Sequence, residues 1–196
     1  SDSTYEPESS ESFAAMARNL DQTPEAALYD HLINSEVDLS MAILFFTNYS
    51  EYNLDAVREM QMDDTTVTGL SDAGAHVSLI FDAVNPTYQL TYWGRDRNRG
   101  ETLPLAHLVH RATEKNAKLF GFDDRGLLEE GKRADINVID FDNLKLTDLR
   151  LLNDLPAGGI RLMQGASGYD ATIINGVLTR RFDKDTGARP GRLVRS

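Results

Sequence analysis

The chain contains an uninterrupted apolar run at residues 41–46, Met-Ala-Ile-Leu-Phe-Phe, and a shorter apolar, β-branched run at residues 66–70. Because no polar residue alternates with the apolar ones, the first run is typical of a strand buried on both faces, as in a parallel sheet covered by helices. The second run predicts another buried strand, followed by a tight loop. Helical periodicity or capping signals mark residues 12–20, 23–33 and 53–62. The order of these segments predicts βα units and an α/β fold.

The second run ends at a serine and an aspartate, Ser71 and Asp72, and Gly74 and His76 follow closely. In α/β proteins, ligands and catalytic groups gather just outside the carboxyl ends of parallel strands, and Asp72 is predicted to lie there. The alternative is a plain turn, because an aspartate side chain readily binds nearby backbone N–H groups. The local sequence leaves both interpretations open.

The longest helix is predicted to begin around Thr102 and Pro104 and to end at Gly121. The glycine-bounded, charged stretch before it, residues 94–100, is predicted to be a loop. The apolar residues that recur along the helix are predicted to form its buried face: Leu105, Leu108, Val109, Ala112 and Leu119.

After residue 121 the apolar pattern changes to that of strands. Residues 126–128 and 134–141 predict one hairpin, with a charged turn between them. Asn175-Gly176, between two strand-like runs, is the strongest two-residue hairpin signal. A last strand-like run lies at residues 191–195. We therefore predict two parts, an α/β part at residues 1–121 and an all-β part at residues 122–196.

Charge and composition restrict the partners and the metal ligands. The formal net charge of −11 argues against a nucleic-acid partner, because phosphate binding requires a basic face. No apolar run approaches the ~20 residues that span a bilayer, and no signal-peptide pattern opens the chain, so we predict no membrane partner and a cytoplasmic location. The chain has no cysteine, so a metal would be held by aspartate, glutamate or one of the four histidines, which are His31, His76, His107 and His110.

Four segments carry a recognisable family pattern. They are residues 69–76 (Gly-Leu-Ser-Asp-Ala-Gly-Ala-His), residues 124–136 (Asp-Arg-Gly-Leu-Leu-Glu-Glu-Gly-Lys-Arg-Ala-Asp-Ile), residues 174–177 (Ile-Asn-Gly-Val) and residues 186–195 (Thr-Gly-Ala-Arg-Pro-Gly-Arg-Leu-Val-Arg). Through these segments the chain resembles the C-terminal part of the amidohydrolase superfamily. More narrowly, it resembles the N-acyl-D-amino-acid deacylases (D-aminoacylases), well over residues 41–196 and loosely over residues 1–40.

The resemblance implies a (β/α)8 TIM-type barrel with one or two divalent metals, usually zinc, and a small β-sandwich domain. Residues 1–121 would then be the C-terminal part of the barrel, and residues 122–196 the C-terminal part of the sandwich. It also implies amide hydrolysis by metal-activated water, with Asp72 as metal ligand and general base. This chemistry is sound, because a metal lowers the pKa of bound water toward ~7 and a carboxylate can carry the proton to the leaving amine.

The sequence departs from the family pattern in its metal ligands. It contains no His-x-His pair, and a catalytic zinc normally has three protein ligands. We therefore interpret the chain as the C-terminal portion of such an enzyme, which on its own binds no metal and is inactive. Its partner would be the N-terminal part of the barrel or another chain, because an incomplete barrel exposes apolar edges.

The substrate-binding candidates follow from the same resemblance. An N-acyl amino acid carries a free carboxylate, which a guanidinium binds in bidentate fashion, so Arg95 or Arg97 is predicted to bind it. His76 is predicted to polarise the scissile carbonyl or to orient the metal ligand. Asn48 and Tyr49 end the strand at residues 41–46 and are predicted to face the substrate. The alternatives are solvated arginines, a histidine bonded to backbone, and packing under a loop.

Three functions are compatible with these features. The first is a metal-dependent hydrolase of linear amides of the D-aminoacylase type. The second is a non-catalytic association module, which the incomplete ligand set favours and the carboxylate of Asp72 disfavours. The third is a cyclic amidohydrolase resembling dihydroorotases or hydantoinases. The arginines at residues 94–100 and the Pro190-Gly191 terminus favour the deacylase over the cyclic enzyme.

Overall fold

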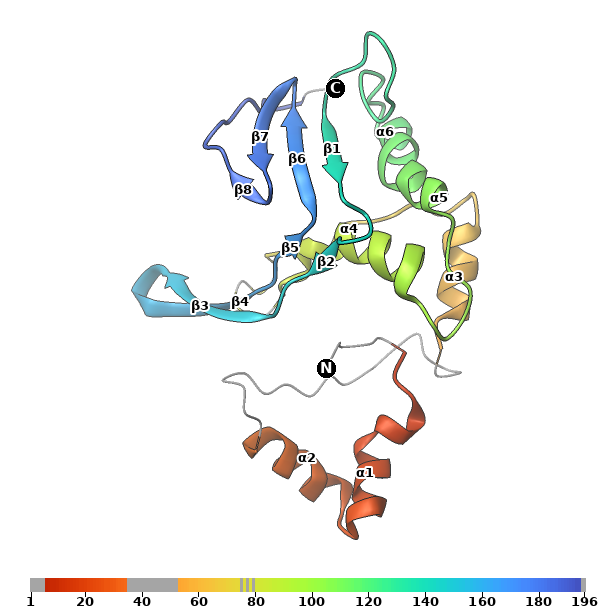
Figure 1. Cartoon of the computed structure of the whole chain (residues 1–196), viewed down its shortest axis with the longest axis vertical. Coiled ribbons are helices and arrows are strands. Elements are labelled where there is room, and N and C mark those ends of the chain that lie inside the picture. Colours follow the sequence, from red (N-terminus) through yellow and green to blue (C-terminus); the bar gives the residue numbers. More distant parts are fainter. Residues whose placement is uncertain (1–5, 35–52, 75, 77, 79, 195–196) are drawn as a thin grey trace. The chain divides into compact units, whose positions relative to one another are not determined.

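The structure, a computed structural model, describes residues 6–34, 53–74, 76, 78 and 80–194 (Figure 1). It divides into two compact units, Ser1–Met62 and Asp63–Ser196. The mixture of helices and strands agrees with the α/β class. The strand predicted at residues 41–46 lies outside the described residues, and the barrel portion and the sandwich stay predictions. The predicted boundary after residue 121 falls inside the second unit, where helices give way to strands between Leu119 and Ile136.

The first unit begins with a short 3-10 turn, η1 (Ser9–Glu11), and a helix pair, α1 (Phe13–Leu20) and α2 (Pro24–Ile33). The Ser12 and Thr23 hydroxyls cap the two helices, each accepting a hydrogen bond from a backbone N–H at 3.2 Å. Such caps satisfy N–H groups that the first turn leaves without a helical partner. Both predicted helices are confirmed.

The third helix of this unit, α3 (Asp55–Met62), follows Asn53, whose side chain accepts a hydrogen bond from the Asp55 N–H at 3.0 Å. The helix predicted after Asn53 is therefore confirmed. The adjacent Leu54 N–H donates to the carboxylate of Glu6 at 2.6 Å, and this glutamate is 1% exposed. Among the described residues of this unit, the buried apolar ones are Ala15, Ala17, Ala27 and Leu54.

The second unit begins with a turn η2 (Asp82–Val84) and a helix formed by α4 (Asn85–Tyr88) and the π-helical η3 (Gln89–Asp96). The predicted loop at residues 94–100 is wrong for residues 94–96, which continue this helix. Gly94 serves packing here, because a side chain at this position would meet Leu108 Cδ1 at 3.2 Å. Gly94 therefore allows η3 to pack closely against Leu108 and does not form a turn.

The long helix consists of α5 (Leu105–His110), the π-helical η4 (Arg111–Lys115) and α6 (Asn116–Leu119). It ends as predicted at Gly121, which has a positive φ of 70°. Its predicted buried face is wrong except for Leu108, since Leu105 is 39% and Leu119 58% exposed. The residues of this helix that are buried instead are Leu108, Arg111 and Ala117.

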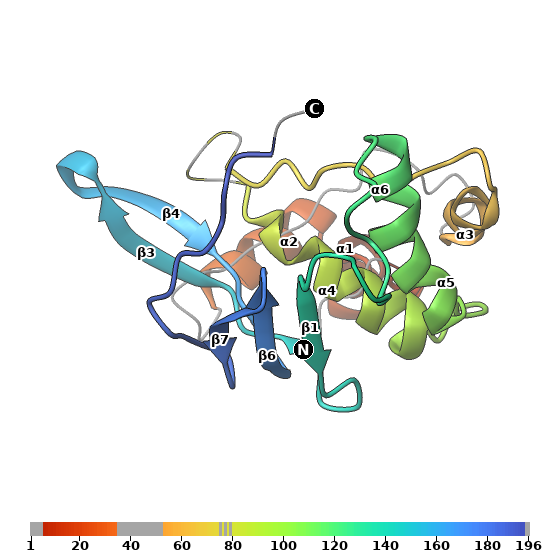
Figure 2. The same ribbon diagram turned by 90° about the horizontal axis from the view of Figure 1, so that it is seen from above.

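Four strands of the second unit form an antiparallel sheet in the order β1-β6-β7-β8. Its members are β1 (Ile136–Ile139), β6 (Tyr169–Ile174), β7 (Val177–Arg181) and β8 (Lys184–Asp185), and Figure 2 shows β1, β6 and β7 side by side. The Asn175-Gly176 hairpin is confirmed, with positive φ at both turn residues (51° and 77°) and Ile174 opposite Val177.

The other predicted hairpin is wrong, because β1 pairs with β6 and not with residues 126–128. Residues around Gly126 instead form turns against the long helix, where a Cβ on Gly126 would lie 2.8 Å from the Ala117 Cβ. The run at residues 191–194 forms no strand in the described part of the chain.

A second hairpin, which the sequence pattern did not indicate, joins β3 (Arg150–Leu155) and β4 (Gly159–Met163) through η5 (Pro156–Gly158). Both views show it extending away from the four-stranded sheet (Figures 1 and 2). A short pair, β2 (Lys145–Leu146) with β5 (Ala166–Ser167), lies at its base. The buried apolar residues in the described part of this unit are Trp93, Leu103, Leu108, Ala117 and Leu144.

Candidate functional site

The segment that leads to Asp72, residues 66–71, has no regular secondary structure and pairs with no strand among the described residues. Its apolar side chains are exposed, at 40% for Val67 and 81% for Leu70, while Thr66 and Thr68 are half-buried. The predicted buried strand at residues 66–70 is therefore wrong for the described structure. The two threonines, rather than the apolar residues, contact the long helix through hydrogen bonds.

Four hydrogen bonds join this segment to the long helix. Arg111 donates from Nη1 to the Thr66 carbonyl and from Nη2 to the Thr66 hydroxyl, both at 3.2 Å. The Thr68 hydroxyl donates to the Arg111 carbonyl at 3.4 Å and accepts from Asn116 Nδ2 at 2.8 Å. We name the set of Thr66, Thr68, Arg111 and Asn116 the threonine clamp.

Burial affects the pKa of the arginine in the clamp. Arg111 is 3% exposed, and this burial lowers the pKa of its guanidinium, against the opposing effect of the Asp64 charge. Just before the clamp, the Thr65 hydroxyl and N–H donate to the Asp63 carboxylate at 2.6 and 2.7 Å. These two hydrogen bonds lower the pKa of Asp63.

Asp72 and His76 follow the threonines of the clamp in the chain, and both are exposed. Each has a left-handed backbone, with φ of 53° for Asp72 and 48° for His76, and Gly74 between them has φ of 94°. Left-handed backbone is uncommon outside glycine, and a non-glycine residue there carries a strain of ~1–3 kcal/mol. Asp72 is exposed, so its carboxylate is open to solvent.

The described residues do not by themselves form a metal-binding site. No group of three His, Asp or Glu side chains in the described ranges could hold a metal ion. Because a catalytic zinc has three protein ligands, the Asp72 carboxylate alone does not constitute a metal site.

Arg95 lies on η3 and binds the segment after β1. Its Nη1 donates to the carbonyls of Phe141 and Asp142, and Nη2 donates to the Leu144 carbonyl at 2.8 Å. Its Nε donates to the carboxylate of Asp96 at 2.6 Å, and this bond raises the pKa of Arg95. The structure therefore engages this guanidinium internally, and its predicted binding of a substrate carboxylate stays a prediction.

Arg97 is 4% exposed and also binds within the chain. Its guanidinium lies 5.0 Å from the ring centre of Trp93, and Nη1 donates to the Glu101 carbonyl at 2.9 Å. A Cβ on Gly100 would lie 2.6 Å from this guanidinium, so the glycine makes room for it. The predicted substrate role of Arg97 stays a prediction, as do those of Asn48 and Tyr49, which lie outside the described residues.

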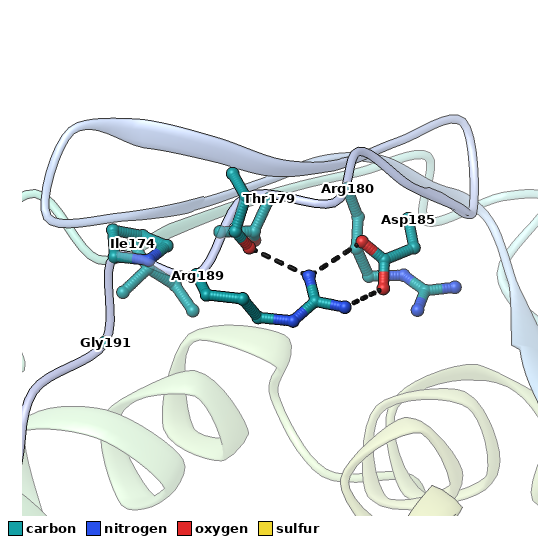
Figure 3. Close-up of a pocket in the computed structure, with 8 residues that line it drawn as sticks. Ile174, Thr179, Arg180, Asp185, Arg189 and Gly191 are labelled. Atoms are coloured by element: carbon teal, nitrogen blue, oxygen red, sulfur yellow. Dashed lines mark hydrogen bonds and ion pairs between the residues drawn. The ribbon is translucent and has the colours of Figure 1, made fainter.

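A depression of about 410 Å³ lies at the end of the sheet (Figure 3). Arg189 makes a bidentate ion pair there with Asp185, at 2.8 and 3.0 Å, which lowers the pKa of Asp185 to about 2. Both side chains of this pair are exposed to solvent. The lining residues are Ile174, Thr179, Arg180, Asp185, Ala188, Arg189, Pro190 and Gly191.

The family model described as "Amidohydrolase family" matches residues 6–180. The chain belongs to the amidohydrolase family. The match includes the clamp, Asp72 and the strands as far as β7, and it supports a hydrolase. Comparison with curated proteins and with solved structures found no significant match.

One further finding concerns membranes. In the part of the chain that the structure describes, no helix has the length and apolarity to cross a bilayer.

Proposed function

We propose that this amidohydrolase-family chain is part of a metal-dependent hydrolase of linear amides, with an N-acyl amino acid as substrate. The observation that carries the proposal is the exposed carboxylate of Asp72, presented on a left-handed turn within the family match. The substrate class rests on the resemblance to D-aminoacylases at residues 69–76, 124–136, 174–177 and 186–195. The rest of the barrel, from the same or another chain, would complete the site.

Asp72 would act as the general base. Its carboxylate accepts a proton from water as the water oxygen attacks the amide carbonyl. It then donates this proton to the amine nitrogen as the C–N bond breaks, which leaves a carboxylic acid and an amine. His76, four residues after Asp72 in the sequence and also exposed, would donate a hydrogen bond to the carbonyl oxygen. A divalent metal, preferentially zinc, would take Asp72 as one ligand and require others from outside the described residues.

The test replaces Asp72 by Asn in the complete protein and measures amine release from N-acetyl-D-amino acids. We expect turnover to fall at least ~100-fold, since a general base contributes 10²–10⁴-fold, with an unchanged circular dichroism spectrum. Asp123→Asn, a change at another aspartate outside the proposed site, is the matched control and should retain full activity. Unchanged turnover by the Asp72 variant would exclude the base role.

The second candidate function is an association module without catalysis. Apolar side chains exposed on the long helix favour it, because Leu105, Val109 and Leu119 are 39%, 44% and 58% exposed. Under this function, the unaltered complete protein would hydrolyse neither linear N-acyl amino acids nor cyclic amides. Hydrolysis of a hydantoin or dihydroorotate, but of no linear amide, would instead identify the cyclic enzyme.

A further inference from the structure

The threonine clamp contains an arginine buried in the middle of a helix without a carboxylate among its hydrogen-bond partners in the described structure. The hydrogen bonds of the Arg111 guanidinium go to the carbonyl and hydroxyl of Thr66. Burying a charge without a carboxylate is costly unless hydrogen bonds compensate. The burial of Arg111 is therefore favourable only while Thr66 lies within hydrogen-bond distance of it. A buried cation thus holds the chain segment that leads to Asp72.

The π-helical turn explains how Arg111 and Asn116 act together. In an α-helix each residue turns by ~100°, so residues five apart point in clearly different directions. In a π-helix the hydrogen bonds run from residue i to i+5, which places residues five apart about one turn apart on the same side. Arg111 begins η4 and Asn116 follows it, so the π-turn aims both side chains at the two threonines.

Thr68 takes part in two of the hydrogen bonds of the clamp. Its one hydroxyl accepts a hydrogen bond from Asn116 and donates one to the Arg111 carbonyl, so it acts both as acceptor and as donor. Asn116 is half-buried and Arg111 is buried, so the hydrogen bonds that they make with Thr68 are partly shielded from water. Loss of the hydroxyl would therefore leave a partly shielded amide donor without its partner, which costs more than an exposed hydrogen bond.

We infer that Thr68, Asn116 and Arg111 are positioning residues for Asp72, an inference that rests on the proposed function. Asp72 follows Thr68 by four residues, a stretch that spans at most ~14 Å when fully extended. Fixing Thr68 on the helix therefore restricts where the carboxylate lies. Catalytic groups need such support, because a 1 Å misplacement lowers a rate by up to ~100-fold.

The first experiment measures the clamp without catalysis, by amide hydrogen exchange and mass spectrometry on this chain. Thr68→Val keeps the side-chain shape and removes both hydrogen bonds, while Thr68→Ser keeps the hydroxyl. We expect exchange at residues 66–74 to rise ~3–10-fold in the valine variant, as for loss of a typical hydrogen bond, and to stay unchanged in the serine variant. Thr113→Val is the control, because its hydroxyl binds the Val109 carbonyl within the same helix.

The second experiment measures the kinetics of the complete protein. Thr68→Val should lower kcat by ~10–100-fold with little change in KM, and Thr68→Ser should restore kcat, because positioning of a base affects the transition state and not substrate binding. Thr113→Val should leave both constants unchanged.

The outcomes separate the two proposals. Unchanged exchange in Thr68→Val, or a kcat equal to that of the unaltered protein while Asp72→Asn is inactive, would overturn the positioning role alone. An active Asp72→Asn variant would overturn the proposed function and with it the positioning of a catalytic base, even if the exchange results show that the clamp exists.

Discussion

At the residue scale, Arg95, Arg97 and Arg111 each direct guanidinium donors at backbone carbonyl oxygens. A guanidinium has five N–H donors in a planar arrangement, so one side chain can hold several carbonyls of a segment without regular structure. Arg95 binds three such carbonyls between Phe141 and Leu144. Arg95 and Arg111 connect helices to irregular chain segments, and Arg97 binds a carbonyl within such a segment. The sequence around these arginines does not reveal this role.

Asp185 provides a pH prediction at the same scale. Arg189 and the Gly187 N–H lower its pKa from 3.8 to about 2. Because the folded pKa lies below the unfolded one, the pair stabilises the fold above pH 3.8, and this contribution is lost as the pH falls through about 2. We expect Arg189→Met to return the Asp185 pKa toward 3.8, as measured by an NMR pH titration of the carboxyl carbon. Arg192→Met should leave it at about 2; equal titration curves for both variants would contradict the assignment.

At the element scale, the sheet is joined to the rest of its unit through close backbone contacts. Gly168, just before β6, has φ of 106°, and a Cβ there would lie 2.7 Å from the Leu144 Cα. Its carbonyl also accepts a hydrogen bond from the Asp140 N–H at 2.9 Å. Here the glycine is required both by the backbone conformation and by the contact with a neighbouring main chain.

This contact gives a stability prediction with an internal control. Gly131 also has a positive φ, of 90°, but no atom lies within 4 Å of the position that a Cβ would take there. Gly131→Ala should therefore cost ~1–2 kcal/mol for backbone conformation alone. Gly168→Ala should cost ~1–3 kcal/mol more, because a backbone atom has to move. Urea unfolding curves would measure both, and equal midpoints would contradict the role of the Leu144 contact.

At the scale of the whole molecule, apolar side chains remain exposed on helices of both units. Tyr29 and Ile33 on α2 are 63% and 57% exposed, and Leu119 on α6 is 58% exposed. Burying such groups removes apolar surface from water and favours association. The net charge of −11 opposes association between identical chains, and salt screens this repulsion.

We therefore expect this chain to associate in a concentration-dependent manner, and more strongly when salt is raised above ~0.15 M. Sedimentation velocity would measure the distribution of species. Val109→Lys combined with Leu119→Lys should reduce association, whereas Lys118→Gln, at an exposed position of the same helix, should not. A single monomeric species at all concentrations and salt levels would contradict this expectation.

The candidate site was partly predictable from sequence. Asp72 was identified because a short apolar run stops there at small and polar residues. The structure adds that the backbone of Asp72 is left-handed. Arg111 and Asn116 were not identified, because their partners lie more than forty residues away, 45 between Arg111 and Thr66 and 48 between Asn116 and Thr68. A π-turn, which aligns them, has no signal in a pattern based on the α-helical period.

What the sequence by itself determined is local: the capped helices after Ser12 and Thr23, the end of the long helix at Gly121, and the Asn175-Gly176 turn. Each depends on residues within a few positions, where capping and backbone preference act directly. The tertiary structure alone decided that β1 pairs with β6 and that Thr68 faces the long helix. These choices depend on which distant segment supplies a hydrogen-bond partner, and no local preference encodes that.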